Sequence, residues 1–336
     1  MDFLIKAWYS KSPWLLLLWP LSLLVQLLAG LRKASLQKGQ ATQLVCPVIV
    51  IGNITAGGTG KTPLLIALAS HLQAQGFKPG IISRGYKSAH SVYPLMVTEE
   101  TPANIAGDEP GLIARKTKCP VVIDPKRMNA LNHLIENAQV DVVLSDDGLQ
   151  HYPLPRSFEI CVVDGARLFG NGLCLPAGPL RESISRIREV DAVVLNGQPS
   201  ESQAALEGAY IMSLQPKFLK HMQSGDKKPF AGAPFKMGTK IQAVAGIGNP
   251  GRFFALLDAL PYPVTAYPFP DHYQYRRADF SSPPFDANQP IVMTEKDGIK
   301  CESFTDVRLW TLDIAVKVPE ELLETVSSHV RDFGRN

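Results

Sequence analysis

The sequence predicts an α/β fold with two α/β/α sandwich domains, a mostly parallel sheet in the first of them, and a separate helix at the N-terminus. Three observations predict it. Short β-rich apolar segments alternate with segments of helical periodicity, which is typical of parallel sheets covered by helices. Several of these strands are continuous apolar runs, as expected of strands buried on both faces. An uncharged apolar run, Trp14 to Leu31, precedes the first strand.

Composition limits the classes of protein to which the chain can belong. Its 336 residues are enough for one large or two ordinary domains with buried cores. A net charge of +3 is too small to indicate nucleic-acid binding, and no nucleic acid is expected as a partner. The 5 cysteines are scattered and lack C-x-x-C spacing. This pattern argues against a disulfide framework or a zinc site and fits a reducing compartment.

The apolar run from Trp14 to Leu31 predicts a membrane-associated region over residues 1–40. It approaches the length of about 20 residues that spans a bilayer, but Pro20, Ser22 and Gln26 interrupt it. Tryptophan, tyrosine and basic residues flank the run, as in helices that lie in the interface: Trp8, Tyr9, Trp14, Trp19, Lys6, Lys11, Arg32, Lys33 and Lys38. We therefore expect a peripheral or monotopic protein. A cleaved signal peptide, a spanning helix and a buried core helix are the alternatives.

The first domain is predicted over residues 41–220. Its strands are expected at Pro47–Gly52, Gly80–Ser83, Val121–Asp124, Val140–Ser145, Glu159–Val163 and Ala192–Asn196. Helical periodicity covers Thr62–Gln75 and Arg127–Ala138. The alternation of the two patterns predicts a parallel sheet with helices on both sides.

The composition changes near Pro216. The segment that follows is basic, contains Gly and Pro and lacks long apolar runs, so residues 221–240 are predicted to form a linker or hairpin. Beyond it, I-Q-A-V-A-G-I-G-N-P-G-R-F-F-A-L-L reads as strand, turn and helix, and P-I-V-M-T-E-K-D-G-I-K repeats the pattern. A smaller α/β domain is therefore predicted over 241–336. Its last, amphipathic helix could pack on either domain.

A glycine-rich loop follows the first strand and opens a helix in the stretch V-I-V-I-G-N-I-T-A-G-G-T-G-K-T-P. Such a loop wraps its N–H groups around phosphate, so we expect a P-loop NTPase-like domain that binds a nucleoside triphosphate. Lys61 can reach the β- and γ-phosphates and Thr62 can ligate Mg²⁺. The phosphate-binding residues are predicted to be Thr55, Ala56, Gly57, Gly58, Thr59, Gly60, Lys61 and Thr62. Thr55 stands where the usual G-x-x-x-x-G-K-[ST] pattern has its first glycine.

Two adjacent acids, Asp146 and Asp147, follow the strand Val140–Ser145. A carboxylate at such a strand end can hold Mg²⁺ together with Thr62 and the phosphates. Two neighbouring carboxylates repel each other without a cation, so the pair itself argues for a metal. Asp146 matches the usual strand-end acid better, and which of the two binds metal directly is left open.

Other polar clusters stand where strands are expected to end. They are S-R-G-Y at 83–86, G-D-E-P at 107–110, L-P-A-G-P-L-R-E at 175–182 and F-P-D-H-Y-Q-Y at 269–275. Ligands of doubly wound sheets bind at the carboxyl ends of strands, so these loops can converge. Taken singly, each is more often a turn, and a lone histidine such as His272 is usually structural.

In their order and number, these motifs resemble the tetraacyldisaccharide 4′-kinase family, the lipid A 4′-kinases. The resemblance covers nearly the whole chain and includes the apolar N-terminus, G-N-I-T-A-G-G-T-G-K-T-P, S-R-G-Y, G-D-E-P, S-D-D-G-L-Q-H, L-P-A-G-P-L-R-E, F-P-D-H-Y and T-E-K-D. It implies transfer of the ATP γ-phosphate to the 4′-hydroxyl of a tetraacyl glucosamine disaccharide 1-phosphate. The product would be lipid IVA, made at the cytoplasmic face of the inner membrane, with no obligate protein partner.

The resemblance also implies roles for single residues. Asp108 of G-D-E-P would be the base that accepts the proton of the attacking hydroxyl, and His272 of F-P-D-H-Y its partner. Lys61 would contact the transferred phosphate, and Asp146 and Asp147 would serve the metal. The family's two α/β/α domains are joined by a two-stranded linker, with the nucleotide in the cleft between them.

The competing function is a membrane-associated P-loop ATPase or GTPase that acts on a protein partner. Such proteins often have a lysine before the two glycines of the loop, where this chain has Ala56. A guanine site would require N-K-x-D or T-K-x-D, but Thr294–Asp297 reads T-E-K-D. In a nucleotide-gated adaptor without catalysis, Asp108, Asp146, Asp147 and His272 would share no purpose.

Overall fold

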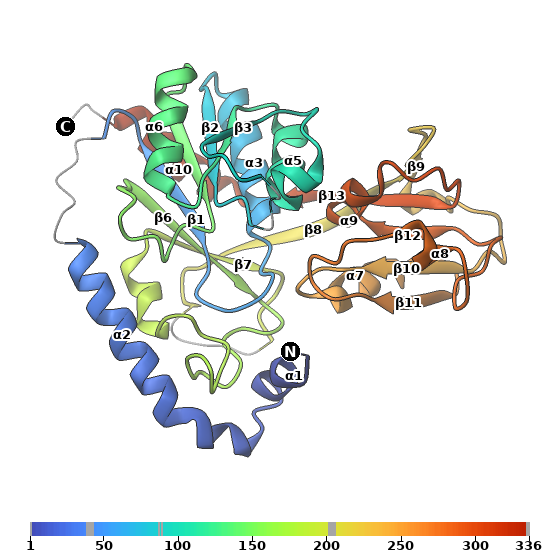
Figure 1. The fold of residues 1–336 in the computed structure, drawn as a ribbon, viewed down its shortest axis with the longest axis horizontal. Coiled ribbons are helices and arrows are strands. Elements are labelled where there is room, and N and C mark those ends of the chain that lie inside the picture. The colour runs from blue at the N-terminus through green and yellow to red at the C-terminus, as the bar shows by residue number, and fades with distance from the viewer. Residues whose placement is uncertain (1, 38–43, 87, 89, 201–205, 334–336) are drawn as a thin grey trace.

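The structure is a computed structural model that describes residues 2–37, 44–86, 88, 90–200 and 206–333. It has a larger first lobe, a smaller second lobe and two long strands that run between them (Figure 1). The mostly parallel sheets and their helices confirm the predicted α/β class. The predicted boundary at residue 40 lies outside the described residues.

The sheet of the first lobe has the strand order β7-β6-β1-β5-β2-β4-β3. Its strands are parallel except for β3, which pairs antiparallel with β4. They are β1 (Val48–Gly52), β2 (Pro79–Ser83), β3 (Leu95–Val97), β4 (Val121–Ile123), β5 (Val142–Asp146), β6 (Phe158–Asp164) and β7 (Ala192–Asn196). Every strand predicted in this region is present, with ends shifted by at most two residues; β3, a short edge strand, was not predicted.

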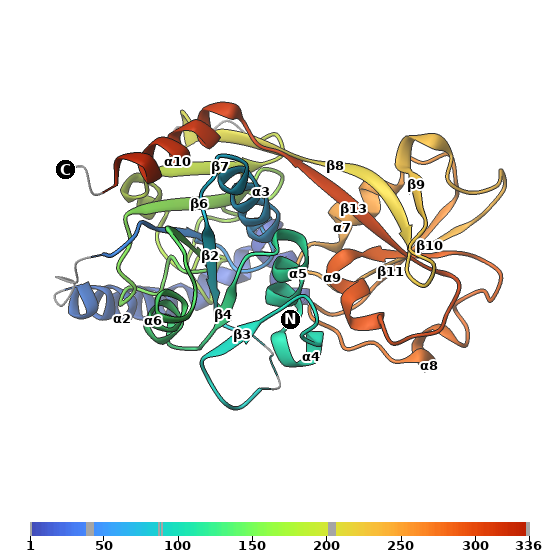
Figure 2. The ribbon, with the colours of Figure 1, turned by 90° about the horizontal axis from the view of Figure 1, so that it is seen from above.

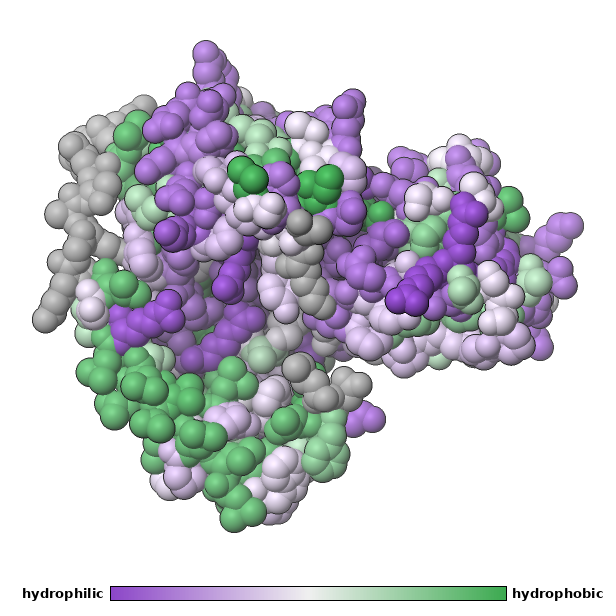
Figure 3. Space-filling view, in the orientation of Figure 1, coloured by the Kyte–Doolittle hydropathy of each residue, from purple (hydrophilic) through white to green (hydrophobic). Residues whose placement is uncertain are grey.

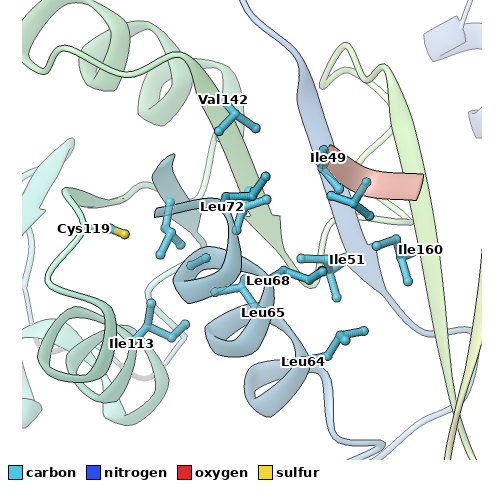
Figure 4. Packing of buried hydrophobic residues seen from close by; sticks show 14 of the residues in the cluster. Ile49, Ile51, Leu64, Leu65, Leu68, Leu72, Ile113, Cys119, Val142 and Ile160 are labelled. Atoms are coloured by element: carbon cyan, nitrogen blue, oxygen red, sulfur yellow. The ribbon is translucent and has the colours of Figure 1, made fainter. Parts of the chain in front are cut away.

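Helices cover both faces of this sheet, because successive side chains of each strand point to opposite sides. Ile49 and Ile51 of β1 pack with helix α3 on one face, whereas Val48 and Val50 belong to a second core on the other face. Figure 4 shows the α3 side together with Leu68. The helices of this lobe are α3 (Lys61–Ala74), α4 (Ala103–Ala106), α5 (Asp108–Thr117) and α6 (Arg127–Asn137), with the 3-10 helix η2 (Ile184–Glu189).

The second lobe is built on strands in the order β11-β10-β12-β13-β8, with β9 paired to β8. These strands are β8 (Tyr210–His221), β9 (Lys227–Pro229), β10 (Ile241–Ala245), β11 (Val264–Pro268), β12 (Ile291–Thr294) and β13 (Leu309–Lys317). The helices are α7 (Pro250–Leu257), α8 (Arg277–Phe280) and α9 (Glu295–Gly298), with the 3-10 helices η4 (Phe230–Gly232) and η5 (Ile299–Cys301).

Strands β8 and β13 join the two lobes. The first residues of β8 pair with β7 of the first lobe, and the rest of the strand pairs antiparallel with β13 (Figure 2). Residues 221–240 contain the turn and the short strand β9 of a β8–β9 hairpin. After β13, helix α10 (Glu320–Asp332) returns to the first lobe. There Leu322, Val326 and Val330 join the core of α3, and His71 Nε2 lies 2.9 Å from Ser327 Oγ.

The N-terminal segment consists of α1 (Asp2–Tyr9), η1 (Pro13–Leu18) and α2 (Trp19–Gln37). Its stretch Pro13–Leu36 is long and apolar enough to cross a membrane, and 11% of its most apolar window is buried. The alternative of a buried core helix is therefore wrong. Leucine side chains such as Leu17, which is 82% exposed, form a continuous apolar surface over this segment (Figure 3).

A few contacts fasten this segment to the first lobe. The Trp8 indole donates to the Pro176 carbonyl at 3.0 Å, and Leu15 is buried beside it. Ser22, which interrupts the apolar run, donates to the Cys174 carbonyl at 2.9 Å and accepts from the Ala177 N–H at 3.0 Å. Ser22 thus binds the apolar run to the first lobe, while leucines around it remain exposed.

Candidate active site

The glycine-rich loop lies between β1 and α3, and side-chain amides fix its backbone. Asn53 Nδ2 donates to the carbonyls of Thr55 and Gly57 at 2.8 and 3.3 Å. Asn196 Nδ2, from the end of β7, donates to the Thr59 carbonyl at 2.9 Å. These amide donors hold the loop carbonyls in place, so the N–H groups of the glycine-rich part of the loop can face an anion at the start of α3.

Gly60 precedes α3 with φ +98°, and a Cβ at this position would lie 2.2 Å from Asn196 Nδ2. Only glycine fits here without displacing the amide that fixes the loop.

Thr55, the departure from the usual loop pattern, has a structural partner. It is buried and forms an isolated antiparallel bridge with Leu180, and the Ala56 N–H donates to the Pro179 carbonyl at 2.7 Å. Arg181 N–H donates to the Ile54 carbonyl at 2.7 Å. The L-P-A-G-P-L-R-E loop therefore runs beside the phosphate loop and carries Arg181 into the site.

Lys61, the first residue of α3, contacts one of the paired acids. Its Nζ lies 3.3 Å from Asp147 Oδ1, and Arg181 approaches Asp147 Oδ2 at 3.2 Å. Burial would raise the pKa of Asp147, but the charges of Lys61 and Arg181 outweigh it and lower the pKa to about 2.

Asp146 has a different environment from its neighbour. It is 1% exposed; Ser83 Oγ donates to its Oδ2 at 3.3 Å, and its Oδ1 has no hydrogen-bond partner. Burial, followed by the charges of Glu109 and Asp147, raises the pKa of Asp146 to about 7. A cation bound beside Asp146 would stabilise the ionised form of this buried carboxylate.

The donor set fits a hard divalent cation that also takes ligands from a phosphate. Asp146 offers an unpartnered carboxylate oxygen, and Thr62 follows Lys61 in the first turn of α3. Within the described ranges, no group of three His, Cys, Asp or Glu residues is arranged to hold a metal alone. Oxygen donors completed by phosphate are typical of Mg²⁺.

Asp108 and His272 meet across the two lobes. Asp108 is the first residue of α5 and is 4% exposed, while His272 follows β11 with a left-handed φ of +59°. The His272 N–H donates to the Gly246 carbonyl at 3.0 Å, and its Nδ1 lies 3.1 Å from Asp108 Oδ2. The Tyr86 ring packs edge-on against the imidazole, and the centres of the two rings lie 5.2 Å apart.

The charges around Asp108 favour its ionised form. Burial would raise the pKa of Asp108, but the hydrogen bond with His272 and the charges of Lys300 and Lys296 outweigh it, so the pKa is below its usual value. Lys296 also contacts Glu109 Oε1 at 2.7 Å and lies 3.4 Å from His272 Nε2.

Sequence reasoning did not assign a role to either lysine. A signal for them was present, since Lys296 and Lys300 are four residues apart in T-E-K-D-G-I-K and share one helical face.

Arg167 was also missed, and it connects both lobes. Its guanidinium donates to the Gly58 carbonyl at 2.6 Å and to the Gly248 carbonyl at 3.3 Å, and its Nε donates to Asp164 Oδ2 at 3.2 Å. The Tyr9 ring of α1 lies 5.3 Å from the guanidinium carbon. No local pattern distinguishes this arginine, because its partners are backbone carbonyls brought together by the fold.

The structure thus places the predicted residues in two adjoining groups. The phosphate loop, Lys61 and the acids Asp146 and Asp147 form one group at the carboxyl ends of β1 and β5. Asp108 and His272 form the other, and Lys296 and Glu109 stand beside it. Together the groups offer a loop that can hold phosphate, oxygen donors for a cation, and a buried carboxylate in contact with a histidine.

Comparisons with known proteins show what the chain as a whole is similar to. A family model described as Tetraacyldisaccharide-1-P 4′-kinase (LpxK) matches residues 14–331. A tetraacyldisaccharide 4′-kinase of Hahella chejuensis is 43% identical over 335 residues, covering 98% of this chain and 96% of the relative. One from Nitrosococcus oceani is 45% identical over 318 residues, covering 94% and 90%.

A crystal structure of LpxK from Aquifex aeolicus in complex with ATP is similar throughout. It matches with a TM-score of 0.74 and 30% sequence identity, covering 93% of this chain and 98% of the other.

Proposed function

The chain belongs to the tetraacyldisaccharide-1-phosphate 4′-kinase family, and from that premise we propose that Asp108, His272 and Lys61 carry its reaction. The enzyme is an ATP-dependent phosphotransferase of lipid A biosynthesis. It transfers the γ-phosphate of ATP to the 4′-hydroxyl of tetraacyl glucosamine disaccharide 1-phosphate and yields lipid IVA. The observation that carries the proposal is the 3.1 Å contact between His272 Nδ1 and Asp108 Oδ2, beside the phosphate loop.

Asp108 acts as the general base in this proposal. Its carboxylate accepts the proton of the 4′-hydroxyl, the hydroxyl oxygen forms a bond to the γ-phosphorus, and the bond from that phosphorus to the leaving oxygen of ADP breaks. The electron pair of the broken bond remains on ADP. A sugar hydroxyl is a weak nucleophile, so an aligned carboxylate that takes its proton late in the reaction assists the transfer.

His272 and Lys61 assist the transfer in different ways, His272 by orienting the base and Lys61 by contacting the phosphates. His272 fixes the orientation of the Asp108 carboxylate through its Nδ1. Lys61 lies 3.3 Å from Asp147 Oδ1 and would turn from that carboxylate to the β- and γ-phosphates of bound ATP.

The predicted phosphate-binding residues are Thr55, Ala56, Gly57, Gly58, Thr59, Gly60, Lys61 and Thr62. The N–H groups that follow Ala56 would hold the phosphates of ATP, while the Ala56 N–H itself donates to the Pro179 carbonyl. Asp146 and Thr62 would hold Mg²⁺, with Asp147 beside them. When bound, the ion neutralises charge on the phosphates.

The proposed domains correspond to the two lobes. Residues 41–220 would form the kinase domain and 241–336 the smaller domain that delivers His272. The predicted linker, 221–240, falls in the β8–β9 hairpin, and the connection between the lobes is made by β8 and β13. Because the base and its partner lie on different lobes, closing the cleft would complete the site and limit hydrolysis of ATP by water.

The exposed leucines of residues 1–40 would rest in the inner membrane at its cytoplasmic face, as in a peripheral or monotopic protein. That placement brings an acylated sugar in the membrane to a site supplied with cytosolic ATP.

Purified protein, Mg-ATP and the disaccharide 1-phosphate, mixed in detergent micelles, test the proposal. A bisphosphorylated product should be found by mass spectrometry, and an Asp108→Asn variant should not form it. The competing function, an ATPase or GTPase acting on a protein partner, predicts nucleotide turnover that ignores the added sugar. The family match and the relatives' common name do not favour that function.

A further inference from the structure

Lys300 is a buried lysine on the second lobe that faces Asp108 on the first. Its side chain is 2% exposed, and its Nζ lies 2.8 Å from Asp297 Oδ1 and 3.7 Å from Asp108 Oδ2. The ammonium also lies 5.0 Å from the centre of the Tyr275 ring. Burying a lysine is costly unless its charge is paired, so this group has a structural or chemical reason to be here.

Asp297 connects the lysine to the backbone that carries His272. Its Oδ2 accepts from the Gly246 N–H at 3.0 Å and from Thr294 Oγ1 at 2.7 Å, while its Oδ1 faces Lys300. The Gly246 carbonyl in turn accepts from the His272 N–H at 3.0 Å. One carboxylate therefore contacts Lys300 and the backbone that carries His272, the two groups of the second lobe that approach Asp108 Oδ2.

We propose that Lys300 is a positioning residue, whose buried ammonium holds Asp108 ionised and presents one of its oxygens to the acceptor hydroxyl. The inference rests on the proposed role of Asp108 as the base. His272 and Lys300 both approach Oδ2 of Asp108. Oδ1 is therefore the oxygen assigned to the substrate proton.

Lys300 keeps a carboxylate partner throughout the reaction, because it lies between Asp108 and Asp297. Before transfer, Asp108 and Asp297 are negative and Lys300 is positive. When Asp108 takes the proton of the hydroxyl, Lys300 remains paired with Asp297 at 2.8 Å. No unpaired buried charge is left behind, which avoids the penalty that breaking a buried ion pair carries.

Other charged and titratable groups also face this region. Glu109 follows Asp108 in α5; burial would raise the pKa of Glu109, but the charges of Lys296 and Lys61 outweigh it and lower this pKa. The second lobe presents His272, Lys296, Lys300, Tyr275 and Asp297. Of the cationic groups near Asp108, Lys300 is the one buried to 2% and already paired on its far side.

The pH dependence of kcat tests the inference in the full-length enzyme. Lys300→Met alone would leave Asp297 unpaired, so the variant to use is Lys300→Met/Asp297→Asn, which keeps the buried charge balanced. Removing a cation raises the pKa of a neighbouring carboxylate, by about 1–3 units for a close partner. The acid limb of the kcat profile should therefore move to higher pH. The double variant should therefore lose several-fold in kcat relative to wild type at pH 5.5, more as the pH falls further and less at pH 8, with an unchanged KM for ATP.

Lys300→Arg keeps the charge and should restore the acid limb. If the double variant does not fold, as judged by circular dichroism, Lys300→Gln/Asp297→Asn replaces it, since this pair keeps both side chains polar and leaves no carboxylate unpaired. A wild-type acid limb in the folded variant, with kcat lowered equally at every pH or not at all, would show a purely structural role and overturn the inference.

Asp108→Asn separates this inference from the proposed function. Near-normal kcat in that variant removes Asp108 as the base and the inference with it. An inactive Asp108→Asn beside an unshifted Lys300 variant removes only the role of Lys300.

Discussion

His272 belongs to the second lobe and Asp108 to the first, and Nδ1 of the imidazole lies 3.1 Å from Oδ2 of the carboxylate. The contact joins residues 164 positions apart and exists only when the lobes are together. It is a contact between lobes and, on the proposed mechanism, part of the chemistry.

A double-mutant cycle on this pair is the first prediction. Asp108→Ala should lower kcat by roughly a hundred- to ten-thousand-fold, the usual loss for a general base. His272→Ala should also lower kcat, and the double variant should be little worse than the worse single one, because residues that act as a unit are not additive. Steady-state kinetics with saturating lipid give kcat, and nucleotide titration should show little change in ATP affinity. Losses that multiply, with weaker ATP binding in His272→Ala, would instead make the histidine a nucleotide contact.

Lys61→Ala is the second prediction. Without the ammonium, the β- and γ-phosphates lose their charged contact, so phosphoryl transfer should fall below detection while the fold is retained. Lys118→Ala is a matched control, because its side chain is 72% exposed and pairs only loosely with Glu99 at 3.8 Å. That control should keep wild-type turnover. A folded Lys61→Ala enzyme with near-normal turnover would show that this loop does not hold the transferred phosphate.

The sequence was informative wherever the determinants are local. The strand Val142–Asp146 and helix α3 follow from apolar runs and periodicity, and the phosphate loop from glycine spacing between them. The match of Asp108 and His272 to family motifs brought them together as candidates before their contact was visible.

What the sequence could not predict depends on distant pairing. Arg167 uses backbone carbonyls of Gly58 and Gly248, which leave no mark on residue types. The four-residue spacing places Lys300 on one helical face with Lys296, but it does not reveal that Lys300 is buried, because the burial depends on contact with Asp108 of the other lobe. Strand β3 was missed for a similar reason, since three residues at a sheet edge have no period to detect.

The third prediction concerns Arg167. Arg167→Met retains the aliphatic stem but removes the donors to both carbonyls, so the phosphate loop should lose its fixed position against the second lobe. Hydrogen bonds of charged donors contribute about 1.5–3 kcal/mol, so we expect KM for ATP to rise by about tenfold or more. Arg331→Met, at a side chain 47% exposed on α10, is the control and should leave KM unchanged. If Arg167→Met also has a wild-type KM, the contact does not position the loop.

The fourth prediction separates the membrane surface of the N-terminal segment from its docking to the first lobe. Leu17, Leu28 and Leu31 are 82%, 56% and 60% exposed, whereas Trp8 and Ser22 make contacts with the body. Replacing the three leucines by serine removes apolar area and spares the docking contacts. At about 1.5–3 kcal/mol for each leucine that would insert, membrane partitioning should fall by at least about a hundredfold.

Sedimentation with vesicles measures this partitioning, and activity on micellar substrate checks that the site is intact. Deleting residues up to Leu31 should release the protein as well, but it also removes Trp8 and Ser22. A triple variant that still sediments fully with vesicles would place the anchor elsewhere.

The last prediction concerns the return of the chain to the first lobe. Helix α10 follows β13 and buries Leu322 completely beside α3, in the core that supports the phosphate loop. Leu322→Ala should lower the free energy of unfolding by about 2–5 kcal/mol, the usual cost of a cavity at a buried leucine. Glu324→Ala, on the same helix with a side chain 54% exposed, should change it by less than about 0.5 kcal/mol. Chemical denaturation measures both values.

Because Leu322 touches neither the base nor the loop, kcat of the folded Leu322→Ala enzyme should stay near wild type. Equal stability of the two variants would mean that α10 does not pack on α3 in solution, whereas a large loss of kcat in the folded enzyme would mean that α10 sets the geometry of the site as well as its stability.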